Sequence, residues 1–266
     1  MEDTTMELAA DNMTRRDAWA WRFVCTALSF ALFGIGGVML RLLILPVVLH
    51  WPGPPAVRRR RARRTVGRAF WLHSQFMYRT GVLDYRFEGL ERLGRPGQMI
   101  VANHPSLIDV VFLIGHVPDA NCIVKHSLWK NPCMRGPVRV AQYISNDGSA
   151  EMLERAADVL REGQTLIVFP EGTRTTPGKA PVFHRGAAAI AVRGAHTITP
   201  VFVTVRPTTL TKAEPWYRIP HRRVQMDFRV GDDIAVADFS NGHPAPLASR
   251  RINEHLHALY ARELKA

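Results

Sequence analysis

An apolar run passes directly into polar residues in the stretch QMIVANHPSLID, residues 98–109. Residues 98–102 are typical of a buried strand, and Pro105 and Ser106 favour the start of a helix over residues 106–114. His104 therefore falls at the carboxyl end of a strand, where open α/β sheets bind their ligands. The stretch predicts a strand, a polar loop and a helix in succession.

A second apolar run ends in the same way in LIVFPEGTR, residues 166–174. Pro170 and Gly172 shape the turn, and the charged residues follow it together. The planar guanidinium of Arg174 suits an acidic group such as a phosphate. We expect Glu171 either to position Arg174 or to form a hydrogen bond with a bound substrate. A structural Glu–Arg pair that closes a tight turn is an equally common explanation of this pattern.

The rest of the chain alternates between the two kinds of element. Strands are also predicted at residues 83–87, 122–124, 165–169, 198–205 and 224–230, and further helices at residues 150–161, 186–192 and 247–264. Strands that alternate with helices indicate an α/β fold, with a mostly parallel sheet flanked by helices.

The N-terminal region contains a long apolar segment. Residues 23–40 carry no charge, Arg41 interrupts, and residues 42–49 are again apolar. A membrane-spanning helix needs about 20 apolar residues. A buried core helix is the weaker alternative, because such helices are rarely apolar on every side over this length. The sequence therefore predicts that residues 1–55 form a hydrophobic helical membrane anchor.

The topology of this anchor is open between two arrangements. Gly34, Gly36 and Gly37 favour a turn midway, which predicts a helical hairpin that dips into one leaflet. A single span is the alternative. Arginines flank the apolar segment on both sides, and basic flanks favour the cytoplasmic side. In either arrangement we expect the rest of the chain to face the cytoplasm.

Positive charge is concentrated next to the apolar segment. The net charge is +12, and residues 1–70 carry 11 arginines and no lysine against 5 acidic residues. Seven of those arginines lie between Arg58 and Arg68. A solvated helix face, nucleic acid and anionic lipid headgroups are the possible explanations. We expect residues 56–82 to form a basic amphipathic connecting helix, and residues 83–266 to form the catalytic domain.

Two classes of site are disfavoured by the residues. The three cysteines show no CxxC spacing, and no His/Cys ligand pattern is present, so we expect no metal and a reducing compartment. A GxSxG elbow is missing as well, which argues against a serine hydrolase.

His104 and Asp109 suggest a specific chemistry. A carboxylate on one imidazole nitrogen fixes the tautomer and raises the basicity of the other nitrogen. That second nitrogen can then accept a proton from a hydroxyl nucleophile. Taken alone, a His and an Asp five residues apart are weak evidence, since many such pairs are capping or surface residues. If this nucleophile attacks a carbonyl carbon, an oxyanion forms. We expect backbone N–H groups near Gly172 or near Ser106 to stabilise it.

These motifs together resemble the glycerolipid acyltransferase family, bacterial type, whose best-known members acylate lysophosphatidic acid. Its first motif, His-x4-Asp usually preceded by Asn, is matched by Asn103, His104 and Asp109. Its Phe-Pro-Glu-Gly-Thr-Arg motif is matched in full by residues 169–174, and its proline-bearing strand by residues 198–202. The resemblance implies that His104 and Asp109 are catalytic. It implies that substrate is bound by Asn103, Lys125, Glu171, Gly172, Thr173, Arg174 and Pro200.

The remaining family motif is only partly kept. Lys125 resembles the family's phosphate-binding lysine. The family usually ends this motif with an arginine, whereas this chain has Asn146 at that position. Losing a charged hydrogen bond to phosphate costs about 1.5–3 kcal/mol, which is enough to change the preferred acceptor. Other lysophospholipids and lyso-aminolipids therefore stay open as acceptors.

The resemblance implies an O-acyltransferase, similar to 1-acylglycerol-3-phosphate acyltransferase, that needs no cofactor. The implied donor is an acyl-coenzyme A or acyl carrier protein thioester, and the acceptor is a lysolipid. Membrane lipids are the other expected partner, nucleic acid is not expected, and the expected location is the bacterial inner membrane. The alternatives are a membrane-tethered nucleic-acid-binding protein and a non-catalytic lipid-binding scaffold.

Overall fold

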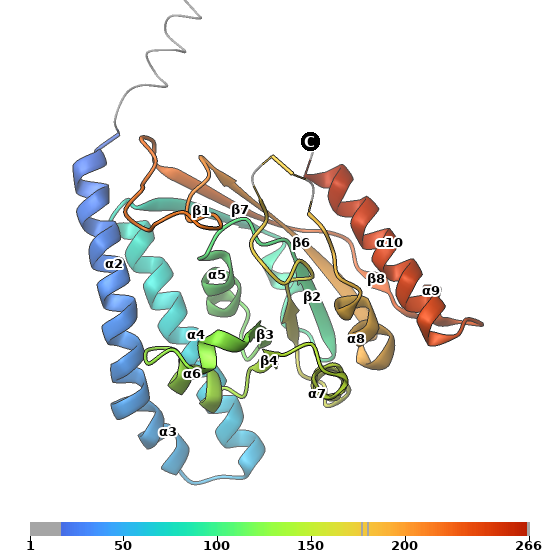
Figure 1. The fold of residues 1–266 in the computed structure, drawn as a ribbon. Helices are drawn as coiled ribbons and strands as arrows, with labels where there is room; N and C mark the ends of the chain where they lie inside the picture. The colour runs from blue at the N-terminus through green and yellow to red at the C-terminus, as the bar shows by residue number, and fades with distance from the viewer. Residues whose placement is uncertain (1–16, 177, 180, 265–266) are drawn as a thin grey trace, which may run out of the picture.

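A computed structural model describes residues 17–176, 178, 179 and 181–264. An eight-stranded sheet forms its centre, in the order β1-β7-β6-β2-β5-β3-β4, with β8 paired to β6 (Figure 1). The strands are β1 (Leu83–Glu88), β2 (Gln98–Ala102), β3 (Asn121–Lys125), β4 (Ile144–Asn146), β5 (Leu166–Val168), β6 (Thr197–Arg206), β7 (Val224–Val230) and β8 (Ile234–Ala235). β7 and β8 run antiparallel to β6, and the other neighbouring strands are parallel.

Helices surround this sheet. They are α2 (Trp19–Met39), α3 (Leu45–His50), α4 (Pro55–Arg79), α5 (Asp109–His116), α6 (Arg135–Val140), α7 (Ala150–Arg161), α8 (Gly186–Gly194), α9 (Ala237–Ser240) and α10 (Ala245–Glu263). Leu40–Ile44 form a π-helical turn between α2 and α3, and Leu90–Arg92 and His126–Trp129 form 3-10 turns. The predicted α/β class with a mostly parallel sheet flanked by helices is therefore confirmed.

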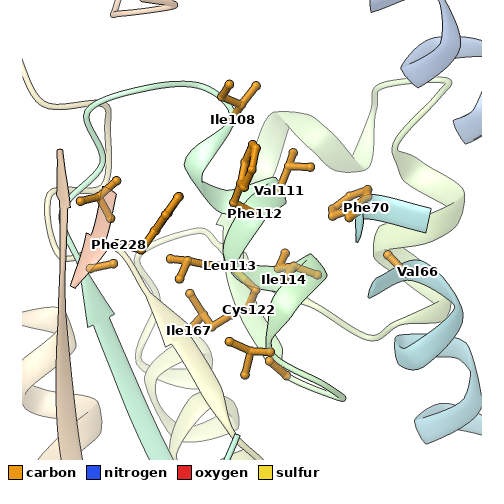
Figure 2. Close-up of a cluster of buried hydrophobic side chains, with 14 of the residues drawn as sticks. Val66, Phe70, Ile108, Val111, Phe112, Leu113, Ile114, Cys122, Ile167 and Phe228 are labelled. Carbon is orange, nitrogen blue, oxygen red and sulfur yellow. The ribbon is translucent and has the colours of Figure 1, made fainter. Parts of the chain in front are cut away.

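Alternate residues of each strand pack against different helices. In β2, Ile100 and Ala102 join a core with α4 and α5, whereas Met99 and Val101 join a core with α7, α8 and α10. This alternation is the period of two that a strand imposes on its side chains. Figure 2 shows the first core, where Phe70 of α4 lies near α5. The N-terminal helices therefore share a core with the sheet.

The predicted turn at Gly34–Gly37 is wrong. α2 continues through these glycines, and the apolar helix runs on to His50. A Cβ on Gly37 would lie 2.6 Å from the carbonyl oxygen of Cys133, so this glycine permits close packing rather than a turn. The chain reverses instead at residues 51–54, and α4 returns beside α2 and α3. Pro46 is accommodated next to the π-helical turn.

The helix Trp19–His50 is long and apolar enough to cross a membrane, with a mean hydropathy of 2.3 over its most apolar window. Only 11% of that window is buried within the protein. Large apolar side chains are exposed along it, among them Val24, Leu28, Leu32, Ile35, Leu42, Leu43 and Val47. This surface fits a membrane helix by length and composition. Residues 1–16 of the predicted anchor lie outside the described residues.

Candidate active site at the carboxyl end of the sheet

His104 and Asp109 meet beyond the end of β2. Nδ1 of His104 lies 2.6 Å from Oδ1 of Asp109. The Asp109 side chain is fully buried, and its carboxylate also accepts hydrogen bonds from the backbone N–H groups of Ser106, at 3.0 Å, and Val110, at 2.7 Å. These two donors fix the carboxylate, so that its Oδ1 faces the imidazole.

The helix after this loop begins at Asp109 and not at Ser106 as predicted. Residues 105–108 form a loop because their polar groups bond to the segment that follows β6. The Ser106 hydroxyl donates to the carbonyl oxygen of Thr209 at 2.9 Å, and the Leu107 N–H donates to that of Leu210 at 3.2 Å. Asp109 therefore stands in the first turn of α5, facing back toward His104.

The imidazole of His104 is held on one side and open on the other. Its Nδ1 is buried, faces Asp109 and has no other polar partner among the described residues. The ring lies against the Phe169 ring, with 4.6 Å between centroids. The side chain keeps 17% exposure. Nδ1 is thus committed to the carboxylate, while Nε2 is left for a reacting group.

Glu171 fixes the backbone that carries His104. Its Oε1 accepts hydrogen bonds from the His104 N–H at 2.9 Å and from the Thr175 hydroxyl at 2.6 Å. The Thr175 N–H donates to the His104 carbonyl at 2.7 Å. Glu171 is buried, which raises the pKa of its carboxyl group above the usual value. The polar atoms of Glu171 therefore serve the His104 loop, a role that the sequence did not predict.

Replacing Glu171 tests this positioning. Gln keeps a carbonyl oxygen for both donors, so we expect kcat to stay within about tenfold of wild type for Glu171→Gln. Leu leaves the His104 N–H and the Thr175 hydroxyl unpaired, and a displaced catalytic group costs about 10²-fold. We expect such a loss of kcat, with an unchanged KM, for Glu171→Leu. Steady-state kinetics checks this, and equal losses in both variants would contradict it.

Arg174 is tied to the backbone. Its Nη1 donates to the carbonyl oxygens of Leu210 and Thr211, both at 2.8 Å. Since Leu210 and Thr209 also bind the 105–108 loop, Arg174 joins both strand-end loops to one segment. The predicted pair with Glu171 does not form, because each side chain bonds elsewhere. Nη1 is thereby occupied and is not available to a substrate phosphate.

The two expected sources of oxyanion donors are both engaged. The Gly172 N–H donates to the Phe169 carbonyl at 3.1 Å, and the Ser106 N–H donates to Asp109. Gly172 has φ of +63°, a conformation that favours glycine. The main role of Gly172 is therefore to allow the backbone conformation of this turn. Gly172 and Thr173 are both exposed beside the His104 loop.

Asn103 and Pro200 lie in the sheet and not on its surface. Asn103 is buried, and its amide both donates to the Val203 carbonyl and accepts from the Val203 N–H, each at 2.8 Å. Pro200 is buried opposite Val101, between the β6 residues that pair with β8 and those that pair with β7. Its carbonyl oxygen accepts a hydrogen bond from the Gly231 N–H at 2.9 Å. Both residues shape the sheet beneath the site, which differs from the predicted contact with substrate.

Tyr260 is a positioning residue that the sequence analysis missed. Its hydroxyl donates to the Val101 carbonyl at 2.6 Å and accepts from the Val201 N–H at 3.1 Å. It thus bridges β2 and β6 just below His104, and the side chain is fully buried. Tyr260 continues the apolar face of α10 four residues after Leu256, which was the available signal.

Lys125 and Asn146 are adjacent at the same edge of the sheet. They are register partners at the carboxyl ends of β3 and β4, and both are exposed. β3 is two strands from β2, a separation of about 10 Å. Lys125 therefore shares an edge with His104 without touching it.

An apolar pocket of about 270 Å³ lies beside the catalytic loop. Leu107 and Ile108 of that loop line it, together with side chains of α2, α4 and α5. His73 lines the same pocket, and burial lowers the pKa of its imidazole to about 4. His73 is therefore neutral near pH 7, and the pocket suits an uncharged ligand.

This chain is similar to known proteins in both sequence and fold. A family model described as Acyltransferase matches residues 84–204. The 1-acyl-sn-glycerol-3-phosphate acyltransferase of Pseudomonas aeruginosa is 26% identical over 45% of this chain and 49% of its own. That of Helicobacter pylori is 31% identical over 52% of this chain and 63% of its own. The chain spans about half the length of the curated relatives that it matches.

A solved structure extends the likeness to most of the chain. The 1-acyl-sn-glycerophosphate acyltransferase of Thermotoga maritima superposes with a TM-score of 0.69 at 22% identity. The match covers 92% of this chain and 98% of that one. At this identity the superposition shows a shared fold.

Proposed function

The chain belongs to the acyltransferase family that includes 1-acyl-sn-glycerol-3-phosphate acyltransferases, and on that premise we propose that it transfers a fatty acyl group from a thioester to a hydroxyl of a lysolipid. The observation that carries the proposal is the His104–Asp109 pair, at 2.6 Å between Nδ1 and Oδ1, with the His104 side chain partly exposed at the carboxyl end of the sheet. The donor is an acyl-coenzyme A or an acyl carrier protein thioester. The most favoured acceptor is 1-acylglycerol 3-phosphate.

The proposed reaction needs a base but no covalent enzyme intermediate. Nε2 of His104 accepts the proton of the acceptor hydroxyl as its oxygen attacks the thioester carbonyl carbon. Asp109 stabilises the imidazolium that forms. The tetrahedral intermediate then collapses, the C–S bond breaks, and the thiolate leaves. It takes the proton from His104, so the products are an ester and a free thiol.

The apolar pocket is the natural place for an acyl chain. It reaches the catalytic loop at Leu107 and Ile108 and continues among the phenylalanines of α2 and α4. Burial of each methylene stabilises the complex by about 0.8 kcal/mol. A chain held there has its carbonyl end near His104.

Lys125 is the proposed partner of the acceptor's anionic headgroup. It is exposed at the same sheet edge as His104, and no carboxylate among the described residues pairs with it. Arg174 binds carbonyl oxygens through Nη1, which leaves its remaining N–H groups for a headgroup. Asn146 beside Lys125 contributes no charge, so lysolipids without a phosphate monoester stay within the proposed acceptor class.

We further propose that the apolar helix lies in the inner membrane, with the catalytic domain facing the cytoplasm. The exposed apolar side chains continue along the helix to α3, and α3 packs beside α4, whose first turns carry the arginines, as at a membrane interface. We do not favour nucleic acid as the partner of the arginines. Arg60 and Arg63 both pair with Asp119, each at 2.9 Å, so part of the cluster is structural.

Replacing Leu28, Leu32 and Ile35 with serine tests the membrane surface. These side chains are exposed on α2 at helical spacing, and each contributes about 1–2 kcal/mol when buried in lipid. We expect the triple variant to shift from the pellet to the supernatant when sedimented with anionic vesicles in high salt. The control Val182→Ser/Leu247→Ser changes exposed apolar residues elsewhere and should stay bound. Retention of the triple variant would contradict this surface.

The test of the function is acyl transfer by the purified protein in mixed micelles. Labelled acyl-coenzyme A and acyl carrier protein thioesters are offered with lysophosphatidic acid, other lysophospholipids and a lyso-aminolipid. The proposal expects an ester product with at least one acceptor. Absence of product with every pair, with folded and membrane-bound protein, would overturn it.

A further inference from the structure

The connection between β6 and β7, residues 207–223, lies between the start of α2 and the loop that carries His104 (Figure 1). A cavity of about 20 Å³ marks the place where the three segments meet. Arg22 of α2, Ile108 of the catalytic loop and Trp216 of the connection all line it. The 207–223 segment therefore joins the apolar helix to the catalytic loop.

Arg22 fixes the end of the 207–223 segment that adjoins β7. Its Nη2 donates to the carbonyl oxygen of His221 at 2.5 Å, and its Nη1 donates to that of Arg222 at 3.1 Å. Its Nε donates to the carbonyl oxygen of Asp17 at 2.7 Å. Arg22 is only 3% exposed. Because a guanidinium is planar, bonds from all three of its nitrogens fix the orientation of the carbonyl groups as well as their distance.

The middle of the segment packs on α2 and is braced from within. The Trp216 ring lies against the rings of Phe23 and Phe30, with centroids 6.3 Å and 5.6 Å apart. The Glu214 carboxylate accepts hydrogen bonds from the backbone N–H of Thr211 at 2.9 Å and from its hydroxyl at 3.1 Å. These contacts stiffen the segment between its two ends.

Leu210 attaches the other end of the segment to both strand-end loops. Its carbonyl oxygen accepts from the Leu107 N–H at 3.2 Å and from Nη1 of Arg174 at 2.8 Å. Leu210 is buried and has φ of +52°, which few residues other than glycine adopt. Such a conformation persists only where the surroundings fix it, and it is common next to active sites. The neighbouring Thr209 carbonyl accepts from the Ser106 hydroxyl at 2.9 Å.

We propose that Arg22 of the apolar helix is a positioning residue for His104 and acts through the 207–223 segment. This inference rests on the proposed function, in which His104 is the base. Release of the segment at residues 221 and 222 allows Thr209 and Leu210 to shift, and the loop that carries His104 shifts with them. A displacement of about 1 Å in a catalytic group costs up to about 10²-fold. α2 thus acts in catalysis in addition to its proposed role in the membrane.

Kinetics in mixed micelles tests the effect on catalysis. Gln is shorter than Arg and has no planar fork to span both carbonyl groups, so we expect Arg22→Gln to lower kcat by about 10- to 10²-fold. Arg22 does not line the apolar pocket, so KM should stay within about twofold for both substrates. Arg22→Lys keeps the charge and reaches one carbonyl at a time, and its kcat should lie between those of wild type and Arg22→Gln.

The control is Arg193→Gln, since the Arg193 guanidinium donates to a carbonyl within α8, that of Ala189. This variant should keep the wild-type kcat. Wild-type kcat in a folded Arg22→Gln variant, or an equal loss in the control, would overturn the inference. If Arg22→Gln does not fold, Arg22→Lys is compared with the control in the same way, and a wild-type kcat in Arg22→Lys would then overturn it.

Amide hydrogen exchange tests the coupling without any measurement of activity. In Arg22→Gln we expect peptides that cover residues 103–109 and 209–211 to exchange at least about tenfold faster than in wild type, with α7 unchanged. Unchanged exchange at 103–109, or a uniform increase in every peptide, would overturn the inference. The expected pattern in a protein whose wild type transfers no acyl group would overturn the proposed function and leave the coupling standing.

A double variant tests whether Arg22 acts through the attachment of the catalytic loop. Ser106→Ala removes the hydrogen bond to the Thr209 carbonyl and leaves α2 untouched. If both residues act through the 207–223 segment, Arg22→Gln/Ser106→Ala should lose less kcat than the product of the two single losses. Fully multiplicative losses would overturn the inference.

Discussion

Replacing His104 with alanine should lower kcat for acyl transfer by about 10²- to 10⁴-fold, the range that a positioned general base contributes. The reason is that Nδ1 of His104 faces Asp109, which leaves Nε2 of the partly exposed imidazole as the nitrogen that can accept the proton. The apolar pocket and Lys125 are untouched by the change, so KM for both substrates should move little. Initial rates of ester formation measure the effect, and circular dichroism establishes that the variant is folded.

His257→Ala is the control for this experiment, because that histidine is exposed on α10 far along the chain from the catalytic loop. It should retain the wild-type rate. A folded His104→Ala variant with wild-type kcat would contradict the assignment of the base. A loss of the same size in both variants would show a general effect on folding or on membrane binding.

Asp109→Asn should lower kcat by a comparable factor, again about 10²- to 10⁴-fold. The carboxylate is fully buried and accepts from two backbone N–H groups, so its oxygen can only face the imidazole. An amide in this place presents an N–H group to one of those partners, which disturbs the tautomer or the orientation of the ring. The pH dependence of kcat should change along with its size.

The double variant His104→Ala/Asp109→Asn distinguishes a positioning role from an independent one. If Asp109 acts through His104, the double variant should be no slower than His104→Ala alone, because residues that act as a unit are not additive. Multiplicative losses would contradict that dependence. Both single variants must first melt within a few degrees of wild type.

The sequence predicted the strands well, because apolar runs that end at turn residues mark buried strands. The observed bounds of β2, β7 and α7 agree with the predicted ones. β4 and β8 were not predicted, since three and two residues are too few for a periodic pattern. The predicted family is confirmed by the family model and by the curated relatives.

The supporting contacts of the site could not be predicted, because they join residues far apart in the chain. Glu171 binds the His104 N–H from 67 residues away, and Tyr260 binds the Val101 carbonyl from 159 residues away. Arg174 was expected to face a substrate, yet its Nη1 holds the segment after β6. A motif predicts which side chains lie together at one edge of the sheet. Their hydrogen-bond partners lie on loops, and the conformation of a loop leaves no periodic pattern in the sequence.

Glycine was the least informative residue in the N-terminal region. Gly37 was expected to form a turn because glycine is common in turns. In the structure it instead permits α2 to approach the backbone of Cys133, and Gly136 in the same way leaves room for the Arg41 side chain. A glycine that is needed for a turn and a glycine that is needed for close packing look the same in the sequence. Only the neighbours of a glycine distinguish them, and those neighbours lie about a hundred residues away.

The measurement that tests the account most directly compares thiol release from an acyl thioester with ester formation, with and without a lysolipid acceptor. If His104 activates the acceptor hydroxyl, free thiol and ester should appear one for one, and only when the acceptor is present. Thiol release at the same rate without acceptor would indicate hydrolysis of the thioester. That result, or ester formation that persists in a folded His104→Ala variant, would contradict the account.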